Sequence, residues 1–441
     1  MRTQPTTTRT STQITTVAND NDGHPRPPAA ALRMPIPDRQ AEKALRELEA
    51  FLRRLPLLNR GVEYGTVSFS MSLLEREVAA HIDPQIIGPI VYSGHVDQEL
   101  ALRYLGLLGF AVSSLERHAQ GAGRPAGSAL AAMPGVERCL LELGRIANHP
   151  PRDSHYTYWL NNNSDDPLTF TGETGEKFFN FAVNQTDLLL GNAADYLLDI
   201  RIGALSLRDP QAVLCIEEAA ASIAILRRVY LDYRRPVEGG TGARMTPLDF
   251  NRMRNYLLPY PVGGMMHSGP NATNVAAYPR VDLAIGWADE AFCATIAQRL
   301  SHMNDRDAAL VRRDLGLPSL AERLLDLIGL RTEKGVSPTI EQLIDHIRQS
   351  GSDGRKVAHA YSLLVKEAHA LSALHWGHIS HYLVHGGKTI PAEMAATMPL
   401  KPHTGVSGSS LDRTHALMSG RSAHWTVTCL PKAVDRLTFA D

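Results

Sequence analysis

Four histidines near the carboxyl end are the clearest candidates for chemistry in this chain. The stretch LHWGHISHYLVHGG, residues 374–387, holds His375, His378, His381 and His385 within eleven positions. An imidazole can ligate a metal ion, hold the iron of a cofactor or hydrogen-bond on a solvated helix face. Residue counting leaves all three interpretations open, and the position of each ring on its helix narrows them.

The histidines belong to one long predicted helix that begins near residue 353. At about 100° per residue, His375 falls in the middle of the apolar stripe, His378 on its edge, and the other two histidines toward a flank. The glycine pair at 386–387 is expected to end the helix. The apolar stripe consists of Val357, Tyr361, Leu364, Ala368, Leu371, Ile379 and Tyr382.

An imidazole in an apolar stripe must satisfy two nitrogens, so its burial needs a reason. One reason is a hydrogen bond to a carbonyl on a neighbouring helix, and the other is ligation of a metal. A di-iron bundle would need Glu-x-x-His motifs, but EAHA at 367–370 has the wrong spacing. A zinc site would need more compact Cys/His pairs. A haem needs one axial histidine between helices and small residues nearby, and His375 with the Gly/Ser-rich loop after it fits this best. A non-haem site at His378, His381 and His385 stays open.

Composition excludes several classes of function. The chain has 441 residues, with 45 Lys and Arg against 46 Asp and Glu, so no global field favours nucleic acid or an acidic membrane. The sequence has no apolar run of the roughly 20 residues that cross a bilayer. The four cysteines are widely separated, which is typical of a protein of the reducing cytoplasm.

The elements that must position the histidines are predicted to be helices. Apolar residues from 38 onward recur mostly at three- and four-residue spacing, and alternating strand patterns are scarce. The expected fold is therefore all-α, a helical bundle with Gly-rich loops. Residues 1–37, rich in Thr and Pro, are expected to be a disordered tail. Residues 38–160 are expected to form an amino-terminal helical region and 161–441 the main helical domain.

Several loops are rich in glycine and small polar residues, and such loops carry function on many helical scaffolds. They are WLNNNSDDPLTFTGETGEK, RRPVEGGTGARM, YPVGGMMHSGPNATN and KPHTGVSGSSLD. Their glycine spacing matches neither a phosphate-binding loop nor a dinucleotide fingerprint. Between two of these loops, MTPLDFNRMRNYLLPY is predicted to be a helix with Thr246 as its N-cap and Pro247 at its first position.

The ordered series of these motifs resembles a known family. HWGHISHYL followed by HTGVSGSS is similar to the proximal-histidine helix and loop of the haem-dependent indoleamine and tryptophan dioxygenases. FNRMRNYLLPY, VGGMMHSGPNA and LTFTGETGEKFF resemble further segments of the same superfamily. With LPLLNRG, GFAVSSLERHA and PGVERCLLELGRIANHPPRD, the chain most resembles the monodechloroaminopyrrolnitrin synthase branch, from about residue 50 to 425.

The resemblance implies an oxygenase with haem b, held by His375 in a slot between helices, and dioxygen as co-substrate. The substrate would be tryptophan or a substituted, for example halogenated, aromatic amino acid in specialised metabolism, and an electron donor would reduce the haem. The implied substrate-binding residues are Arg254, Thr169 and Thr404, and the implied cofactor-binding residues are His375, Gly263, Gly264 and Gly405.

Two departures and several alternatives accompany this resemblance. His403 and Val406 stand where the family's loop has glycine, and Ser372 stands where relatives carry an arginine near a haem propionate. Arg254 could instead form an ordinary salt bridge between helices, and the two threonines could cap loops. Plain indole-ring cleavage to N-formylkynurenine and a haem sensor without turnover are the competing functions.

Overall fold

The computed structural model describes residues 39–65, 70–162, 165–236, 243–271, 274–331, 336–399 and 411–438. The predicted tail and the predicted site residues Thr404 and Gly405 lie outside these ranges. In the described part of the chain nearly all regular structure is helical, and the single sheet has two short strands. The prediction of an all-α fold is confirmed.

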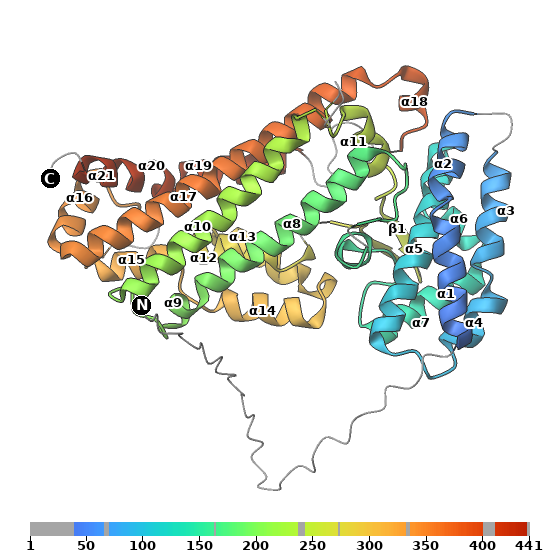
Figure 1. The fold of residues 1–441 in the computed structure, drawn as a ribbon, viewed down its shortest axis with the longest axis horizontal. Helices are drawn as coiled ribbons and strands as arrows, with labels where there is room; N and C mark the ends of the chain where they lie inside the picture. The colour runs from blue at the N-terminus through green and yellow to red at the C-terminus, as the bar shows by residue number, and fades with distance from the viewer. Residues whose placement is uncertain are drawn as a thin grey trace, which may run out of the picture.

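Three long helices run side by side through the middle of the molecule (Figure 1). They are α8 (Thr174–Tyr196), α10 (Pro210–Leu231) and α17 (Gly351–Ile379). The central helix, α10, packs against both others. Ala219 on α10 and Ala358 and Ala360 on α17 are fully buried, and such small side chains let helix backbones approach closely.

Shorter helices make up the rest of the carboxyl-terminal part of the chain. They are α9 (Leu198–Ile202), α11 (Pro247–Arg254), α12 (Ala277–Ile285), α13 (Glu290–Arg299), α14 (Asp305–Leu315), α15 (Leu320–Leu327), α16 (Ile340–Gln349), α18 (Ala392–Ala396), α19 (Leu411–Ala423), α20 (Trp425–Thr428) and α21 (Leu430–Thr438), with single turns at η2 (Asp232–Arg234) and η4 (Leu300–His302). α11 begins as predicted, because Thr246 and Asp249 form a reciprocal capping box and Pro247 follows the cap.

The end of α17 differs from the expectation that the glycine pair at 386–387 stops it. The α-helix ends at Ile379 and continues as a π-helical turn, η5 (Ser380–His385), and a 3-10 turn, η6 (Gly386–Thr389). Asn251 of α11 donates to the Tyr382 carbonyl at 2.8 Å, and the Tyr382 hydroxyl donates to Met245 at 3.3 Å. Packing against α11 therefore accompanies the change of helix type.

The amino-terminal helices form a separate bundle beside the long helices (Figure 1). They are α1 (Arg39–Leu52), α2 (Leu55–Glu63), α3 (Met71–His81), α4 (Pro84–Val91), α5 (Gln98–Gly121), α6 (Ser128–Ala131) and α7 (Pro134–Ala147), followed by the π-helical turn η1 (Tyr156–Leu160). α5 is the centre of this bundle and is buried over most of its length. Asp97 caps its first turn by accepting from the Leu100 amide at 2.8 Å.

The two bundles have distinct apolar cores. One core runs from Ala41 to Phe170, and the other runs from Phe178 to Leu437. The segment 256–262, directly after α11, returns to the amino-terminal core. It leads into an antiparallel hairpin of β1 (Tyr260–Val262) and β2 (Met265–His267). Division of the chain into folding units near residue 160 stays a prediction.

None of the helices in the described ranges has an apolar stretch long enough to span a membrane.

Candidate functional site

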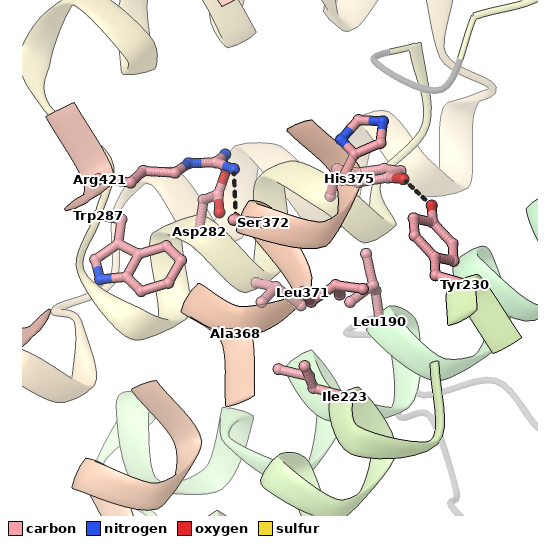
Figure 2. A pocket seen from close by; sticks show the side chains of 12 residues that line it. Leu190, Ile223, Tyr230, Asp282, Trp287, Ala368, Leu371, Ser372, His375 and Arg421 are labelled. Atoms are coloured by element: carbon pink, nitrogen blue, oxygen red, sulfur yellow. Dashed lines mark hydrogen bonds and ion pairs between the residues drawn. The ribbon is translucent and has the colours of Figure 1, made fainter. Parts of the chain in front are cut away.

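A cavity beside His375 lies among the carboxyl-terminal helices. Its volume is about 50 Å³, and its walls come from α8, α10, α12, α17 and α19. Apolar side chains form much of the wall, including Leu190, Ile223 and Leu371 (Figure 2). Three polar groups interrupt the apolar wall: His375, the pair Asp282 and Arg421, and a cluster of hydroxyls.

His375 keeps both ring nitrogens available. Its ring makes an edge contact with Tyr230 at 6.0 Å between centroids, and no described residue hydrogen-bonds to either nitrogen. The ring lies well inside the protein and retains accessible surface at the cavity. Burial, assisted by the neighbouring His378 and Arg421, lowers the pKa of His375 to about 4. The imidazole is therefore neutral at pH 7, the form that a metal ion binds.

His378, one turn later, has the opposite character. It is only 7% exposed, and its Nε2 donates to the Tyr230 carbonyl of α10 at 2.9 Å. Its Nδ1 is buried and has no hydrogen-bond partner among the described residues. Burial is the main reason that the pKa of His378 is lowered to about 4. This is the core histidine bonded to a neighbouring helix that the sequence allowed for, at 378 and not at 375.

The remaining two histidines of the cluster face separate surroundings. His381 makes an edge contact with Tyr382, and the Nδ1 of His385 lies 3.0 Å from the Ser380 carbonyl. No group of three or more His, Cys, Asp or Glu side chains within the described ranges is arranged to hold a metal ion. The described residues thus give no support to a non-haem site built from the outer histidines.

The hydroxyl cluster lies on the far wall from α19. Tyr230 is 3.1 Å from the hydroxyl of Tyr278 and 3.2 Å from that of Thr186. Burial raises the pKa of both tyrosines, so both phenols stay protonated. The hydroxyls of Tyr230 and Tyr278 therefore give this side of the cavity a polar character, and Thr186 extends the hydrogen-bonded cluster beyond the lining. The sequence carried no motif that marked them.

Arg254 is placed at the last turn of α11, where it is fully buried. Burial lowers the pKa of its guanidinium to about 10, so the group is still charged at pH 7. The neighbouring Arg252 forms ion pairs with Glu63 at 2.7 Å and with Glu173 at 2.8 Å. Arg254 is absent from the described wall of the His375 cavity.

Thr169 is also buried, in the segment that enters α8. The carboxylate of Glu176 fixes this segment by accepting from the amides of Phe170 and Thr171, both at 2.7 Å, and from the Thr171 hydroxyl at 2.6 Å. Burial raises the pKa of Glu176, against the opposing effect of these hydrogen bonds. The structure supplies a rigid segment around Thr169 but does not place it on the described cavity wall.

Gly263 and Gly264 form the two-residue turn of the hairpin. Their φ angles are 60° and 77°, which glycine adopts at low cost and which a two-residue hairpin requires. The Gly263 amide donates to Glu137 at 2.8 Å, so the turn packs on α7 of the amino-terminal bundle. Neither glycine lines the described wall of the cavity.

Compatibility of the cavity with a haem depends on its donor set and its size. A neutral imidazole with available nitrogens and apolar side chains line one cavity, and a haem with a histidine ligand requires both. A porphyrin is larger than about 50 Å³, so its entry would displace some of the described side chains. The chemistry of the residues fits the cofactor.

Comparison with protein families gives an independent result. The sequence model of monodechloroaminopyrrolnitrin synthase PrnB matches residues 70–389, well over half of the chain. That stretch includes Thr169, Arg254, the glycine pair and His375, and it ends before Arg421. The family comprises oxygenases that modify tryptophan in pyrrolnitrin biosynthesis. The chain belongs to the monodechloroaminopyrrolnitrin synthase PrnB family.

Proposed function

We propose that this protein is a haem b-dependent oxygenase that acts on tryptophan or a substituted, for example halogenated, aromatic amino acid. The observation that supports it most is His375, a neutral imidazole at a cavity wall with no described hydrogen-bond partner on either nitrogen. An imidazole in such surroundings loses its hydrogen bonds to water without replacement, and ligation of a metal compensates that loss.

The residues of this chain would divide the work. His375 would hold the haem, which when bound supplies the iron for chemistry with dioxygen. Arg254, still charged despite its burial, would pair with the α-carboxylate of the substrate in a bidentate fork that lysine cannot reproduce. Thr169 and Thr404 would hydrogen-bond the substrate, and Gly263, Gly264 and Gly405 would let the backbone approach the bound groups. Holding the ring in place is where most of the protein's contribution would lie.

Further partners follow from the same proposal. An electron donor would keep the haem reduced, and the cytoplasm would supply it. All four cysteines are free thiols in the structure, which supports a reducing compartment.

Oxygen uptake combined with product mass tests the proposal. The reduced full chain is incubated with a panel of tryptophans, tyrosines and indoles, and oxygen consumption is followed. Consumption with a tryptophan, and a product that differs from N-formylkynurenine, supports the proposed oxidation. Formation of N-formylkynurenine would instead assign plain ring cleavage. Haem binding without oxygen uptake on any member of the panel would contradict an enzymatic role.

A further inference from the structure

A guanidinium lies on the same cavity wall as His375. Arg421 of α19 forms an ion pair with Asp282 of α12 (Figure 2). Its Nη1 lies 3.5 Å from the Ser372 hydroxyl of α17, and its guanidinium carbon, Cζ, lies 5.9 Å from the centroid of the Trp287 ring. Only 12% of the arginine side chain is exposed. The guanidinium is thus held by a carboxylate, a hydroxyl and an aromatic face.

Hydrogen bonds between the surrounding helices hold the residues that contact Arg421 in place. α12 ends in a turn at Gly286, with φ of 99°, and the amides of Gly286 and Trp287 both donate to the Asp282 carbonyl at 3.0 Å. The Trp287 indole donates to Thr426 of α20 at 3.0 Å. These bonds hold Asp282 and Trp287, which both contact Arg421. The site therefore draws on four helices, α12, α17, α19 and α20.

A buried ion pair in a cavity wall has a high desolvation free energy. Removing two charges from water costs more than their attraction often returns, so such pairs are weak evidence of a role in stability. Burial raises the pKa of Asp282, and Arg421 opposes that rise. The Nη2 of Arg421 faces this carboxylate. One of the guanidinium nitrogens approaches Ser372, one helical turn before His375.

We propose that Arg421 binds a carboxylate of the cofactor that His375 holds, with Asp282 orienting the guanidinium. This inference rests on the proposed function. The supporting juxtaposition is that imidazole and guanidinium open on one cavity, with Ser372 between them on α17. A haem carries two carboxylates, and a charge-assisted bond to arginine is among the strongest anchors for such a group. Arg421 lies after residue 389, outside the stretch that the family model matches.

Blocked carboxylates provide the test. The full chain, produced without haem supply, is titrated with haem and with haem dimethyl ester, and binding is followed by absorption. Wild type is expected to bind haem at least about tenfold more tightly than haem dimethyl ester, because a charge-assisted hydrogen bond contributes about that much to affinity. Arg421→Gln is expected to lose this preference while ester binding stays unchanged, and Arg421→Lys to retain part of it. Arg436→Gln, which removes an exposed arginine of α21 paired with Glu341, is the matched control and should keep the full preference.

The ratio of the two affinities separates a binding role from a structural one, because a folding defect weakens both ligands alike. A preference that survives in Arg421→Gln, or that is missing in wild type, would overturn the inference and leave the haem proposal intact. Absence of binding by either form in wild type would contradict the haem proposal itself. A second arm compares tryptophan with tryptamine. If Arg421→Gln loses that discrimination and not the haem preference, the arginine serves the substrate and the cofactor assignment is wrong.

Discussion

Two histidines one turn apart show how residue type alone leaves function open. The Nε2 of His378 donates to the Tyr230 carbonyl, whereas His375 has no hydrogen-bond partner among the described residues on either nitrogen. Both are neutral at pH 7 because burial lowers their pKa values to about 4. The neighbouring helix α10 supplies the difference, since its carboxyl end presents a carbonyl to one ring and a phenol edge to the other.

His378→Ala tests the structural half of this contrast. The change removes a buried hydrogen bond to the Tyr230 carbonyl and leaves the space of the ring unfilled, so the free energy of unfolding should fall by about 1–3 kcal/mol. Denaturant melts of the haem-free protein measure the loss, and haem titration of the same variant should show near wild-type affinity. Loss of haem binding with unchanged stability would reverse the roles of the two residues.

Arg254→Leu tests the substrate clamp. Wild type is expected to discriminate tryptophan from tryptamine, and the variant should lose about 2 kcal/mol of that discrimination in kcat/KM. Arg254→Lys is the matched control for charge without the fork, and it should recover only a part. Turnover and substrate affinity that survive unchanged in Arg254→Leu would show that the arginine has an architectural role.

At the scale of elements, the end of α17 packs against α11 shortly after His375. The π-helical turn after Ile379 is held against α11 by Asn251 and Tyr382. Gly386 follows at the close approach to Pro247, where an added Cβ would overlap the proline ring. Gly377, in the same helix, has open space around an added Cβ. Two glycines nine residues apart therefore have different reasons to be there.

Alanine at each glycine makes this difference measurable. Gly386→Ala should lower the free energy of unfolding by about 1–3 kcal/mol, because the helix end must move away from α11. Gly377→Ala should raise it by about 0.5–1 kcal/mol, since alanine favours the helix interior. Thermal and denaturant melts of the haem-free variants provide the values. Equal effects of the two changes would contradict the packing of η6 on α11.

For the whole molecule, buried neutral histidines predict a pH dependence of stability. The pKa values of His149, His375 and His378 are each lowered to about 4, chiefly by burial, against about 6.5 in an unfolded chain. Between these values the unfolded chain binds more protons than the folded one, so stability is lost as pH falls from about 6.5 to about 4. Each histidine contributes a slope of at most about 1.4 kcal/mol per pH unit.

Denaturant midpoints of the haem-free protein at a series of pH values check this slope. His149→Gln should show a shallower fall, and His359→Gln, at an exposed position on α17, should match wild type. A midpoint that does not change with pH across this window, or a His149→Gln slope equal to that of wild type, would contradict the burial of these rings.

The sequence predicted the helical fold because three- and four-residue spacing of apolar residues is a local signal. It also predicted the start of α11, where cap and proline are adjacent in the chain. On α17 it placed Val357, Tyr361 and Leu364 in the core, and all are buried. The relative burial of His375 and His378 depends on where α10 and α19 pack, which a single helix wheel does not contain.

Contacts between distant segments mark the limit of such prediction. Arg421 meets Asp282 across 139 residues, and no local pattern announces either residue. The phenols of Tyr230 and Tyr278 meet across 48 residues in the same cavity. The resemblance predicted that the glycine pair at 263–264 belongs to a cofactor-binding loop. The structure shows that the pair forms a hairpin turn, which needs positive φ.

The most direct test of the central claim is the absorption spectrum of the reduced full chain, produced with ample haem, before and after carbon monoxide. We expect an intense haem band that shifts with carbon monoxide in wild type and in His378→Ala, and loss of the histidine-ligated spectrum in His375→Ala. A wild-type protein that takes up no haem, or a His375→Ala spectrum identical to wild type, would contradict ligation at this residue.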